Sequence, residues 1–282
     1  MKLSEMKAVL DSQGIQLTKS LGQNFLHDAN QLRRIADAAE LTQADKVLEI
    51  GPGLGPLTEL LAERAGQVLA IEKDARLVAV LRERFHLDVG GAPGLRLIHA
   101  DALEWLRRSA RDWRDWKLVA NLPYSLASSL LVELAQARLG PQRMVATLQL
   151  EVARRLMARA GDPDYGLLTL LVQLHYQPRG WFKIPAGCFF PEPEVDSACV
   201  CLARRPQPLL APERAPLFAA IVKRSFSQRR KMMRKLLLAD WPAEKVDRAF
   251  AALHPQPLPP AARAETVTLE QFVGLTQWLS AD

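Results

Sequence analysis

Residues Lys46-Val47-Leu48-Glu49-Ile50-Gly51-Pro52-Gly53-Leu54-Gly55 join a short apolar run to a glycine-rich turn, and this stretch decides the fold. The apolar run predicts a buried strand. Glycines directly after a strand let the backbone turn tightly and approach a ligand that a Cβ atom would exclude. Their spacing is G-x-G-x-G, not the G-x-G-x-x-G of a pyrophosphate-binding turn. A sharp strand-to-helix connection without a ligand is the alternative.

Further apolar runs follow along the chain, with helical patterns between them. The predicted strands are Lys46–Ile50, Gln67–Ile71, Leu95–His99, Lys117–Ala120 and Met144–Leu150, and the predicted helices are Leu57–Ala65, Ala75–Arg84 and Leu126–Ala137. Continuous apolar strands that alternate with helices are typical of a parallel sheet covered on both faces. We therefore predict an α/β fold with a mostly parallel sheet, whose ligands bind beyond the carboxyl ends of the strands.

Polar residues stand where successive predicted strands end. Glu72 ends the second strand, Asp101 follows the third, and Asn121-Leu122-Pro123-Tyr124 follows the fourth. Taken singly, the two acids are more often helix caps, and an Asn-x-Pro segment is more often a turn. Together at one edge of the sheet, they predict a binding site.

The glycine turn and the two acids describe a pocket for a nucleoside. The carboxylate of Glu72 can accept hydrogen bonds from both ribose hydroxyls, and Asp101 is placed to receive an adenine amino group. The turn contains no Lys or Arg, which argues against a nucleotide phosphate. We therefore expect S-adenosylmethionine, whose adenosine carries no phosphate and whose sulfonium is cationic.

The Asn121-Leu122-Pro123-Tyr124 segment suggests the methyl acceptor. An exocyclic amine on a base is a poor nucleophile, because its lone pair is delocalised into the ring. The side-chain oxygen of Asn121 and the carbonyl of Leu122 or Pro123 can accept its N–H groups, and Tyr124 offers a face for stacking the base. Catalysis is then mostly positioning. We expect no metal, since the five His residues lack ligand spacing.

Charge and composition divide the chain into two parts. Residues 1–203 hold 24 Lys+Arg and 24 Asp+Glu, whereas residues 204–282 hold 13 and 7. We predict a catalytic domain over 1–203 with an N-terminal arm over 1–27, a Pro-rich linker over 204–216, and a basic helical RNA-binding domain over 217–282. The alternative is that the net charge of +6 serves only solubility.

The segment 222–238 combines an apolar helical stripe with a cluster of cations. Val222, Phe226, Met233 and Leu237 recur at helical spacing. A charged helical face is usually only solvated, but so many cations without an intervening acid favour binding to RNA phosphates. The predicted RNA-binding residues are Lys223, Arg224, Arg229, Arg230, Lys231 and Arg234.

Composition excludes several classes of protein. With 49% hydrophobic and 24% charged residues the chain can bury a core, which excludes wholesale disorder. No apolar run approaches the roughly 18–20 residues of a membrane span, and the charged start does not fit a signal peptide. Three cysteines are too few for a disulfide framework. We expect a soluble cytoplasmic protein with no membrane partner.

These motifs resemble the ribosomal RNA adenine N6,N6-dimethyltransferases, and most closely the bacterial small-subunit (16S) type. The similarity spans nearly the whole chain and includes Gly22 to Leu26, Glu49 to Gly55, Asn121 to Tyr124, Phe189 to Ser197, and Phe226 to Arg234. The resemblance implies a Rossmann-like class I methyltransferase with a small C-terminal helical domain. It implies cofactor contacts at Asn24, Leu26, Gly51, Glu72, Asp101 and Asn121. It also implies that Phe189 stacks on the target adenine, although a core aromatic is the alternative.

Family resemblance also implies the substrate. Members dimethylate two adjacent adenines in a hairpin near the 3′ end of 16S rRNA, within the immature 30S subunit late in assembly. Nothing in this sequence demands an oligomer, so we expect a monomer. Four alternatives stay open: a large-subunit (23S) enzyme of the macrolide-resistance type, a DNA adenine methyltransferase, a dinucleotide oxidoreductase, and an assembly factor whose methylation is secondary. The sequence departs from the usual family pattern at Leu150, Glu194 and Lys235.

Overall fold

The computed structural model of the chain describes residues 1–15, 24–109, 111–254 and 256–280. These residues form two compact units. Unit 1 comprises Met1–Ala153 and Pro178–Arg204, and unit 2 comprises Arg154–Gln177 and Arg205–Asp282. Each unit is described by itself.

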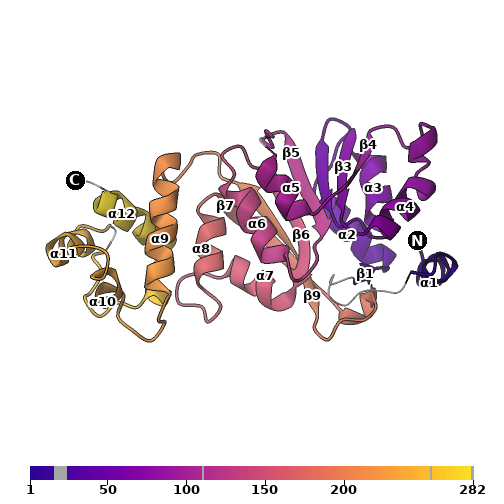
Figure 1. Cartoon of the computed structure of the whole chain (residues 1–282). Helices are drawn as coiled ribbons and strands as arrows, with labels where there is room; N and C mark the ends of the chain where they lie inside the picture. Colours follow the sequence, from indigo (N-terminus) through magenta and orange to yellow (C-terminus); the bar gives the residue numbers. More distant parts are fainter. Residues whose placement is uncertain (16–23, 110, 255, 281–282) are drawn as a thin grey trace. The chain divides into compact units, whose positions relative to one another are not determined.

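Unit 1 is built on a sheet with the strand order β4-β3-β2-β5-β6-β9-β7 (Figure 1). Strands β2 to β6 pair in parallel, and β9 runs antiparallel to β6. The strands are β2 Lys46–Ile50, β3 Gln67–Glu72, β4 Leu95–His99, β5 Trp116–Asn121, β6 Arg143–Gln149, β7 Tyr176–Ile184 and β9 Ser197–Arg204. The predicted α/β class and mostly parallel sheet are confirmed.

A second, two-stranded sheet pairs β1 (Phe25–Leu26) with β8 (Phe189–Phe190), so the end of the predicted N-terminal arm meets a distant part of the chain. Helices pack against the large sheet: α2 lies beside α3, and α5 lies beside α6. The helices of this unit are α1 Leu3–Ser12, α2 Ala29–Ala38, α3 Pro56–Arg64, α4 Ala75–Arg84, α5 Ala102–Arg108 and α6 Ala127–Gln136, with short 3₁₀ turns at Leu87–Val89 and Ala186–Cys188.

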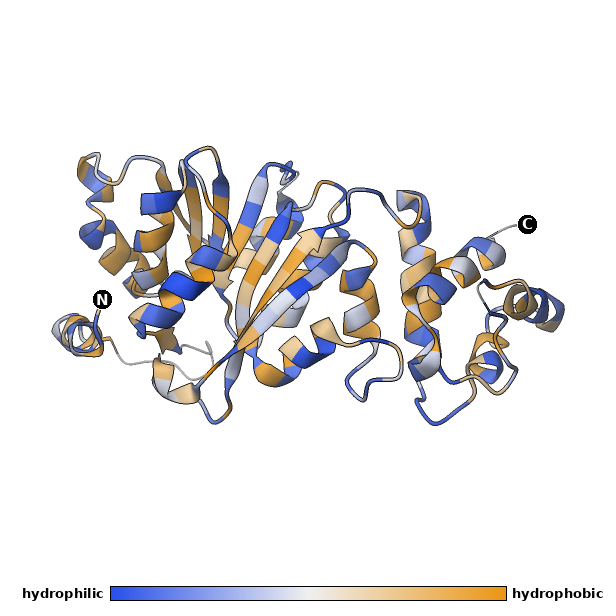
Figure 2. Cartoon of the chain, turned by 180° about the vertical axis from the view of Figure 1, so that it is seen from behind, coloured by the Kyte–Doolittle hydropathy of each residue, from blue (hydrophilic) through white to orange (hydrophobic). Residues whose placement is uncertain are grey.

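The core of unit 1 follows from the apolar strands. Val47, Val68, Val119 and Val145 from four neighbouring strands are at most 1% exposed and belong to one hydrophobic cluster. Figure 2 shows how apolar residues dominate the strands of the sheet. A second cluster joins Met6 and Leu10 of α1 to Leu54 and Leu77 beside the glycine turn. The N-terminal helix is therefore part of the packed structure around that turn.

Unit 2 is helical. Its elements are α8 Leu167–Gln173, α9 Ala215–Ser225, α10 Met233–Leu237, α11 Ala243–Ala251 and α12 Leu269–Ser280, with 3₁₀ turns at Pro212–Arg214 and Ala264–Thr266, and α7 Leu150–Met157 crosses from one unit to the other. Its core centres on Phe218, Val222 and Phe272, and the ring of Phe226 stacks on that of Phe272. The continuous helix predicted over 222–238 is interrupted, because α9 ends at Ser225 and α10 begins at Met233.

The units differ from the predicted domains in two respects. Residues 154–177, predicted as part of the first domain, cluster with the C-terminal residues, because α8 packs against α9. The predicted linker over 204–216 contains the 3₁₀ turn and the start of α9, and Leu210 within it is buried in the core of unit 2. The charge asymmetry follows the units: unit 1 holds 22 Lys+Arg and 22 Asp+Glu, and unit 2 holds 15 and 9.

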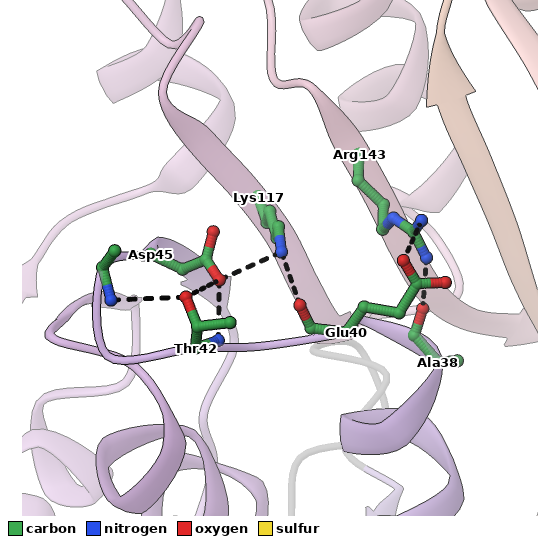
Figure 3. Close-up of polar contacts among 7 residues, drawn as sticks. Ala38, Glu40, Thr42, Asp45, Lys117 and Arg143 are labelled. Atoms are coloured by element: carbon green, nitrogen blue, oxygen red, sulfur yellow. Dashed lines mark hydrogen bonds and ion pairs between the residues drawn. The ribbon is translucent and has the colours of Figure 1, made fainter.

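Two cations fix the end of α2 to the sheet (Figure 3). The buried Nζ of Lys117 donates to the carbonyl of Glu40 at 2.7 Å and lies 3.1 Å from Asp45 Oδ2. Arg143 donates to the carbonyl of Ala38 at 2.9 Å and to the carboxylate of Glu40 at 2.6 Å. Glu40 has φ +50°, a left-handed conformation that favours glycine. The cations therefore stabilise both the helix C-terminus and a strained residue.

We expect Lys117→Met to lower the free energy of unfolding by about 2–4 kcal/mol, because it leaves the carboxylate of Asp45 and the carbonyl of Glu40 without their buried partner. Urea denaturation followed by circular dichroism measures the loss. The matched control is Lys46→Met at the start of the neighbouring strand, where Nζ lies 4.0 Å from an exposed Asp115. Equal losses in the two variants would contradict a structural role for the Lys117 contacts.

Candidate active site

A cavity opens at the carboxyl ends of the parallel strands in unit 1. The end of β2, the end of β3, the turn after β4 and the end of β5 all contribute to its wall. The lining residues are Asn24, Phe25, Ile50, Gly51, Gly53, Ile71, Glu72, Lys73, Leu77, Ala100, Asp101, Ala102, Asn121, Leu122, Pro123, Tyr124, Ser125 and Leu126. Five of the predicted cofactor residues therefore lie around one cavity: Asn24, Gly51, Glu72, Asp101 and Asn121.

The glycine turn forms one wall of this cavity. Gly53 has φ +62°, and a Cβ atom there would lie 2.7 Å from the ring of Phe25. The amide of Gly51 donates to the carbonyl of Ile71 at 2.9 Å, which ties the turn to β3. A Cβ atom on Gly51 would project toward the ring of Pro123 at 3.5 Å. Glycine is required at Gly53 by both conformation and space.

Glu72 is held by three backbone amides. Its Oε1 accepts from the amides of Lys73 at 2.8 Å and Asp74 at 2.9 Å, and its Oε2 accepts from Gly53 at 3.2 Å. The side chain lines the cavity although the residue is only 7% exposed. Burial raises the pKa of this carboxyl above its usual value, while the three amide hydrogen bonds oppose that rise. A carboxylate fixed in this way can accept hydrogen bonds from a pair of hydroxyls.

Asp101 is both a helix cap and a cavity residue. Its Oδ1 accepts from the amide of Glu104 at 3.1 Å at the start of α5, and its Oδ2 accepts from Lys73 Nζ at 2.9 Å. The Lys73 ammonium beside it holds the pKa of Asp101 below its usual range. The predicted acid is therefore ionised, but part of its accepting capacity is used within the protein.

Asn121 has a fixed amide orientation. Its Nδ2 donates to the backbone carbonyl of Asn24 at 3.0 Å, so the amide nitrogen points toward that carbonyl. Its Oδ1 is buried and accepts no hydrogen bond from any residue that the structure describes. A buried acceptor without a partner costs free energy, and a ligand N–H group would satisfy it.

The backbone after Asn121 offers one further acceptor. The carbonyl of Pro123 accepts from the amides of Leu126 and Ala127, both at 3.0 Å, and is therefore used by the start of α6. The amide of Leu122 donates to Thr147 at 3.0 Å, but its carbonyl receives no hydrogen bond from the described chain. Of the two carbonyls considered from the sequence, only that of Leu122 is available.

Tyr124 is the aromatic residue of the Asn121–Tyr124 segment at the cavity. Its hydroxyl lies 2.6 Å from Ser197 Oγ, which fixes the edge of the ring. Burial raises the pKa of Tyr124, so its hydroxyl stays protonated at neutral pH.

Two other predicted site residues lie elsewhere. Leu26 and Phe189 pair across the small sheet, are 2% and 3% exposed, and belong to the hydrophobic core. Neither residue is among those that line the cavity. The predicted motif residues Gly22 and Gln23 lie outside the described residues.

Sequence reasoning missed two features of the site. Phe25 packs under the glycine turn, and Lys73 pairs with Asp101. The position of Lys73 directly after Glu72 was the available signal. Glu49, quoted only as part of the turn motif, is 1% exposed, and its Oε2 has no hydrogen-bond partner among the described residues. Burial raises the pKa of Glu49 to about 8.

The predicted RNA-binding residues of unit 2 fall into three groups. Arg224 pairs with Asp240 and Arg234 pairs with Asp247, each through two hydrogen bonds. Arg229 donates to the carbonyl of Pro163 at 2.9 Å. Lys223, Arg230 and Lys231 are exposed and form no ion pair with a described residue. A surface hollow is lined by Arg224, Arg230, Lys231 and Lys235 among others.

The cavity chemistry fits an adenosine without a phosphate. Within the described ranges its charged lining residues are two acids and one cation, and that cation is paired with Asp101. Ile50, Ile71 and Leu122 provide apolar walls, and Glu72 can accept from ribose hydroxyls. A negative, partly apolar pocket of this kind suits a cationic sulfonium. No group of three His, Cys, Asp or Glu side chains that could hold a metal ion occurs within the described residues.

No helix among the described residues is long and apolar enough to cross a membrane.

The family model and the related sequences indicate the same family. The family described as Ribosomal RNA adenine dimethylase matches residues 14–280. A Geobacillus thermodenitrificans protein named Ribosomal RNA small subunit methyltransferase A is 38% identical over 280 residues, covering 97% of this chain and 94% of that protein. A Streptococcus pneumoniae protein of the same name is 37% identical over 279 residues, covering 98% and 96%.

Solved structures agree with the fold. The crystal structure of the 23S rRNA methyltransferase ErmE matches with a TM-score of 0.68 and 30% identity, covering 92% of this chain and 100% of that one. A dimethyladenosine transferase from Plasmodium falciparum matches with a TM-score of 0.71 and 24% identity, covering 89% and 95%, and supports the fold alone.

The buried carboxyl of Glu49 predicts a pH-dependent stability. Its pKa is raised to about 8 in the folded state, so the folded protein binds more protons than the unfolded chain between about pH 4.5 and 8. Stability from this group is therefore lost as the pH rises through that window. We expect the Glu49→Gln variant to gain stability relative to the original chain from pH 5 to pH 9, measured by urea denaturation. A constant difference between the two proteins would contradict the raised pKa.

Proposed function

The chain belongs to the ribosomal RNA adenine dimethylase family, and we propose that it dimethylates the N6 amino groups of two adjacent adenines near the 3′ end of 16S rRNA, with S-adenosylmethionine as donor. Membership makes the chain an rRNA adenine dimethyltransferase. The observation that carries the proposed site is the Oδ1 of Asn121 at the carboxyl end of β5, which is buried and has no hydrogen-bond partner in the part of the chain that the structure describes.

Two acceptors in the chain suit an adenine amino group. Asn121 Oδ1 accepts one N–H group, and the carbonyl of Leu122 accepts the other. Both hydrogen bonds turn the nitrogen lone pair out of conjugation with the ring and toward the donor. Neither oxygen is basic enough to remove a proton first, so the proton leaves after methyl transfer, when the nitrogen is cationic. Tyr124 stacks on the base, which must be flipped out or unpaired to reach the cavity.

Other cavity residues hold the methyl donor. Glu72 would accept from the ribose hydroxyls, Asp101 would lie at the adenine end, and Asn24 and Gly51 would line the remaining wall. When bound, S-adenosylmethionine supplies a methyl group on a cationic sulfur. The carboxylates stabilise that positive charge, and the packed turn keeps the donor in line with the amine.

Unit 2 is proposed to bind the RNA backbone. Its 15 basic and 9 acidic residues concentrate the positive charge of the chain, while unit 1 is neutral. Lys223, Arg230 and Lys231 are exposed and form no ion pair with any acid that the structure describes, so phosphate contacts cost them no such ion pair. Arg224 and Arg234 are already paired with Asp240 and Asp247 and contribute less.

The small-subunit substrate rests on the relatives named Ribosomal RNA small subunit methyltransferase A. We place the reaction on the immature 30S subunit in the cytoplasm, late in assembly, with the enzyme acting as a monomer. ErmE, a 23S rRNA methyltransferase at 30% identity, keeps large-subunit RNA as the second candidate substrate.

Methyl transfer to separate acceptors tests this proposal. Labelled S-adenosylmethionine is supplied with undermethylated small subunits, large subunits or duplex DNA, and nucleoside mass spectrometry identifies the product. We expect N6,N6-dimethyladenosine in the small subunit alone. Product only in the large subunit would assign the second candidate substrate, and product in neither would refute the proposed reaction.

The Asn121→Ala variant tests the proposed role of the Asn121 side-chain oxygen in the same assay. Removal of an oxygen that acts in the transition state costs about 10²–10³-fold in rate, so we expect kcat to fall by that factor. Because, within the RNA, Asn121 contacts only the target adenine, while the phosphate contacts are made by other residues, binding to the small subunit should stay within about twofold. Full activity in this variant would show that the amino group is held elsewhere.

Salt dependence of RNA binding tests the proposed role of unit 2. We expect the double variant Arg230→Ala/Lys231→Ala to reduce the slope of log Kd against log salt by about 2, because two phosphate contacts are lost. The paired residue Arg234 is the comparison, since Arg234→Ala removes a cation that Asp247 already neutralises. An unchanged slope in the double variant would move the phosphate contacts to other cations.

A further inference from the structure

Strand β7 carries an exposed aromatic residue that the fold does not use. Trp181 is 46% exposed at the edge of the large sheet, between the exposed cations Arg179 and Lys183. A hollow of about 590 Å³ lies beside it, lined by Arg143, Arg179, Trp181 and Phe182 among others. We call these four residues the β7 surface.

Cations surround this hollow. The guanidinium of Arg34 lies 4.0 Å from the ring centre of Phe182, and Arg33 is exposed on the same helix. The acids nearby are already neutralised, since Glu40 pairs with Arg143 and Asp196 pairs with Lys183. Arg179 forms no ion pair with a described residue. The β7 surface is therefore a local positive region on a unit whose total charge is balanced.

The edge of the sheet is unsuited to strand addition by another protein. Pro178 has no N–H group to donate, and Gly180 has φ +131°, which interrupts the regular strand. An edge interrupted in this way resists pairing with a further strand. What remains accessible is the side-chain surface, where an indole and several cations suit a base and its phosphates.

This surface lies away from the catalytic cavity. In β6, Arg143 is four residues before Thr147, and Thr147 pairs with Asn121 of the active site. Four residues of strand span about 13 Å. A nucleotide on the β7 surface is therefore distinct from the target adenine.

We propose that the β7 surface binds an unpaired nucleotide of the substrate rRNA, with its base stacked on Trp181 and a phosphate contacted by Arg179. This inference rests on the proposed function, because it takes ribosomal RNA as the ligand. It adds a second RNA contact, on the catalytic unit, to the phosphate contacts proposed for unit 2.

Kinetics of Trp181 variants test the inference. With small subunits as acceptor, we expect Trp181→Ala to raise the KM for RNA about tenfold, with unchanged kcat and unchanged affinity for S-adenosylmethionine. Trp181→Phe keeps a stacking ring and should retain most of the affinity. Arg179→Ala should lower the slope of log Kd against log salt by about 1, because one phosphate contact is lost.

Two matched controls distinguish loss of the proposed RNA contact from a non-specific effect of removing any exposed side chain. Trp278 of α12 is also 46% exposed, and Arg96 is an exposed cation on β4 at the opposite edge of the sheet. Trp278→Ala and Arg96→Ala should leave KM and the salt slope unchanged. Equal KM values for Trp181→Ala and Trp278→Ala would overturn the inference. Absence of small-subunit methylation by the unmodified protein would instead refute the proposed function.

Discussion

Parallel pairing of β2, β3, β4 and β5 is the constraint on which the catalytic site depends. It brings the carboxyl ends of these strands to one edge, although Gly51 and Asn121 are far apart in sequence. The hydrogen bond from Asn121 to the carbonyl of Asn24 then joins this edge to the segment before β1. Because the same bond orients the amide, the position of the N-terminal segment and the direction of the proposed acceptor oxygen are coupled.

The two ends of the sheet satisfy their polar groups differently. At the amino ends of β5 and β6, Lys117 and Arg143 satisfy the carbonyls of Glu40 and Ala38 at and just after the end of α2, and the carboxylates around them. At the carboxyl end of β5, Asn121 Oδ1 is buried without a hydrogen-bond partner among the described residues. Polar satisfaction stabilises the first end, whereas the second keeps this acceptor available at a cost in stability.

The distribution of charge follows the division between the catalytic unit and the unit proposed to bind RNA. Unit 1 is neutral in total and contains the cavity, whereas the excess cations lie in unit 2, which has no part in that cavity. A negative pocket suits a sulfonium, and a basic surface suits a polyanion, so the separation lets each ligand meet a favourable potential. The β7 surface is the local exception within unit 1 and is the reason for proposing a second RNA contact there.

Strand periodicity, the glycine turn and the residues at strand ends were enough to predict the parallel sheet and four of the cofactor residues around the cavity, Gly51, Glu72, Asp101 and Asn121, since strand direction alone fixes which residues share an edge. The fifth, Asn24, was expected only from the family resemblance. Sequence could not show that α9 stops at Ser225, that Phe189 is buried in the core, or that the Pro123 carbonyl is already used. Nor could it show that Asp240 and Asp247 neutralise two of the predicted RNA-binding arginines. Those outcomes depend on which distant groups meet in space, because hydrogen bonds and ion pairs form between neighbours in the fold and not between neighbours in the chain.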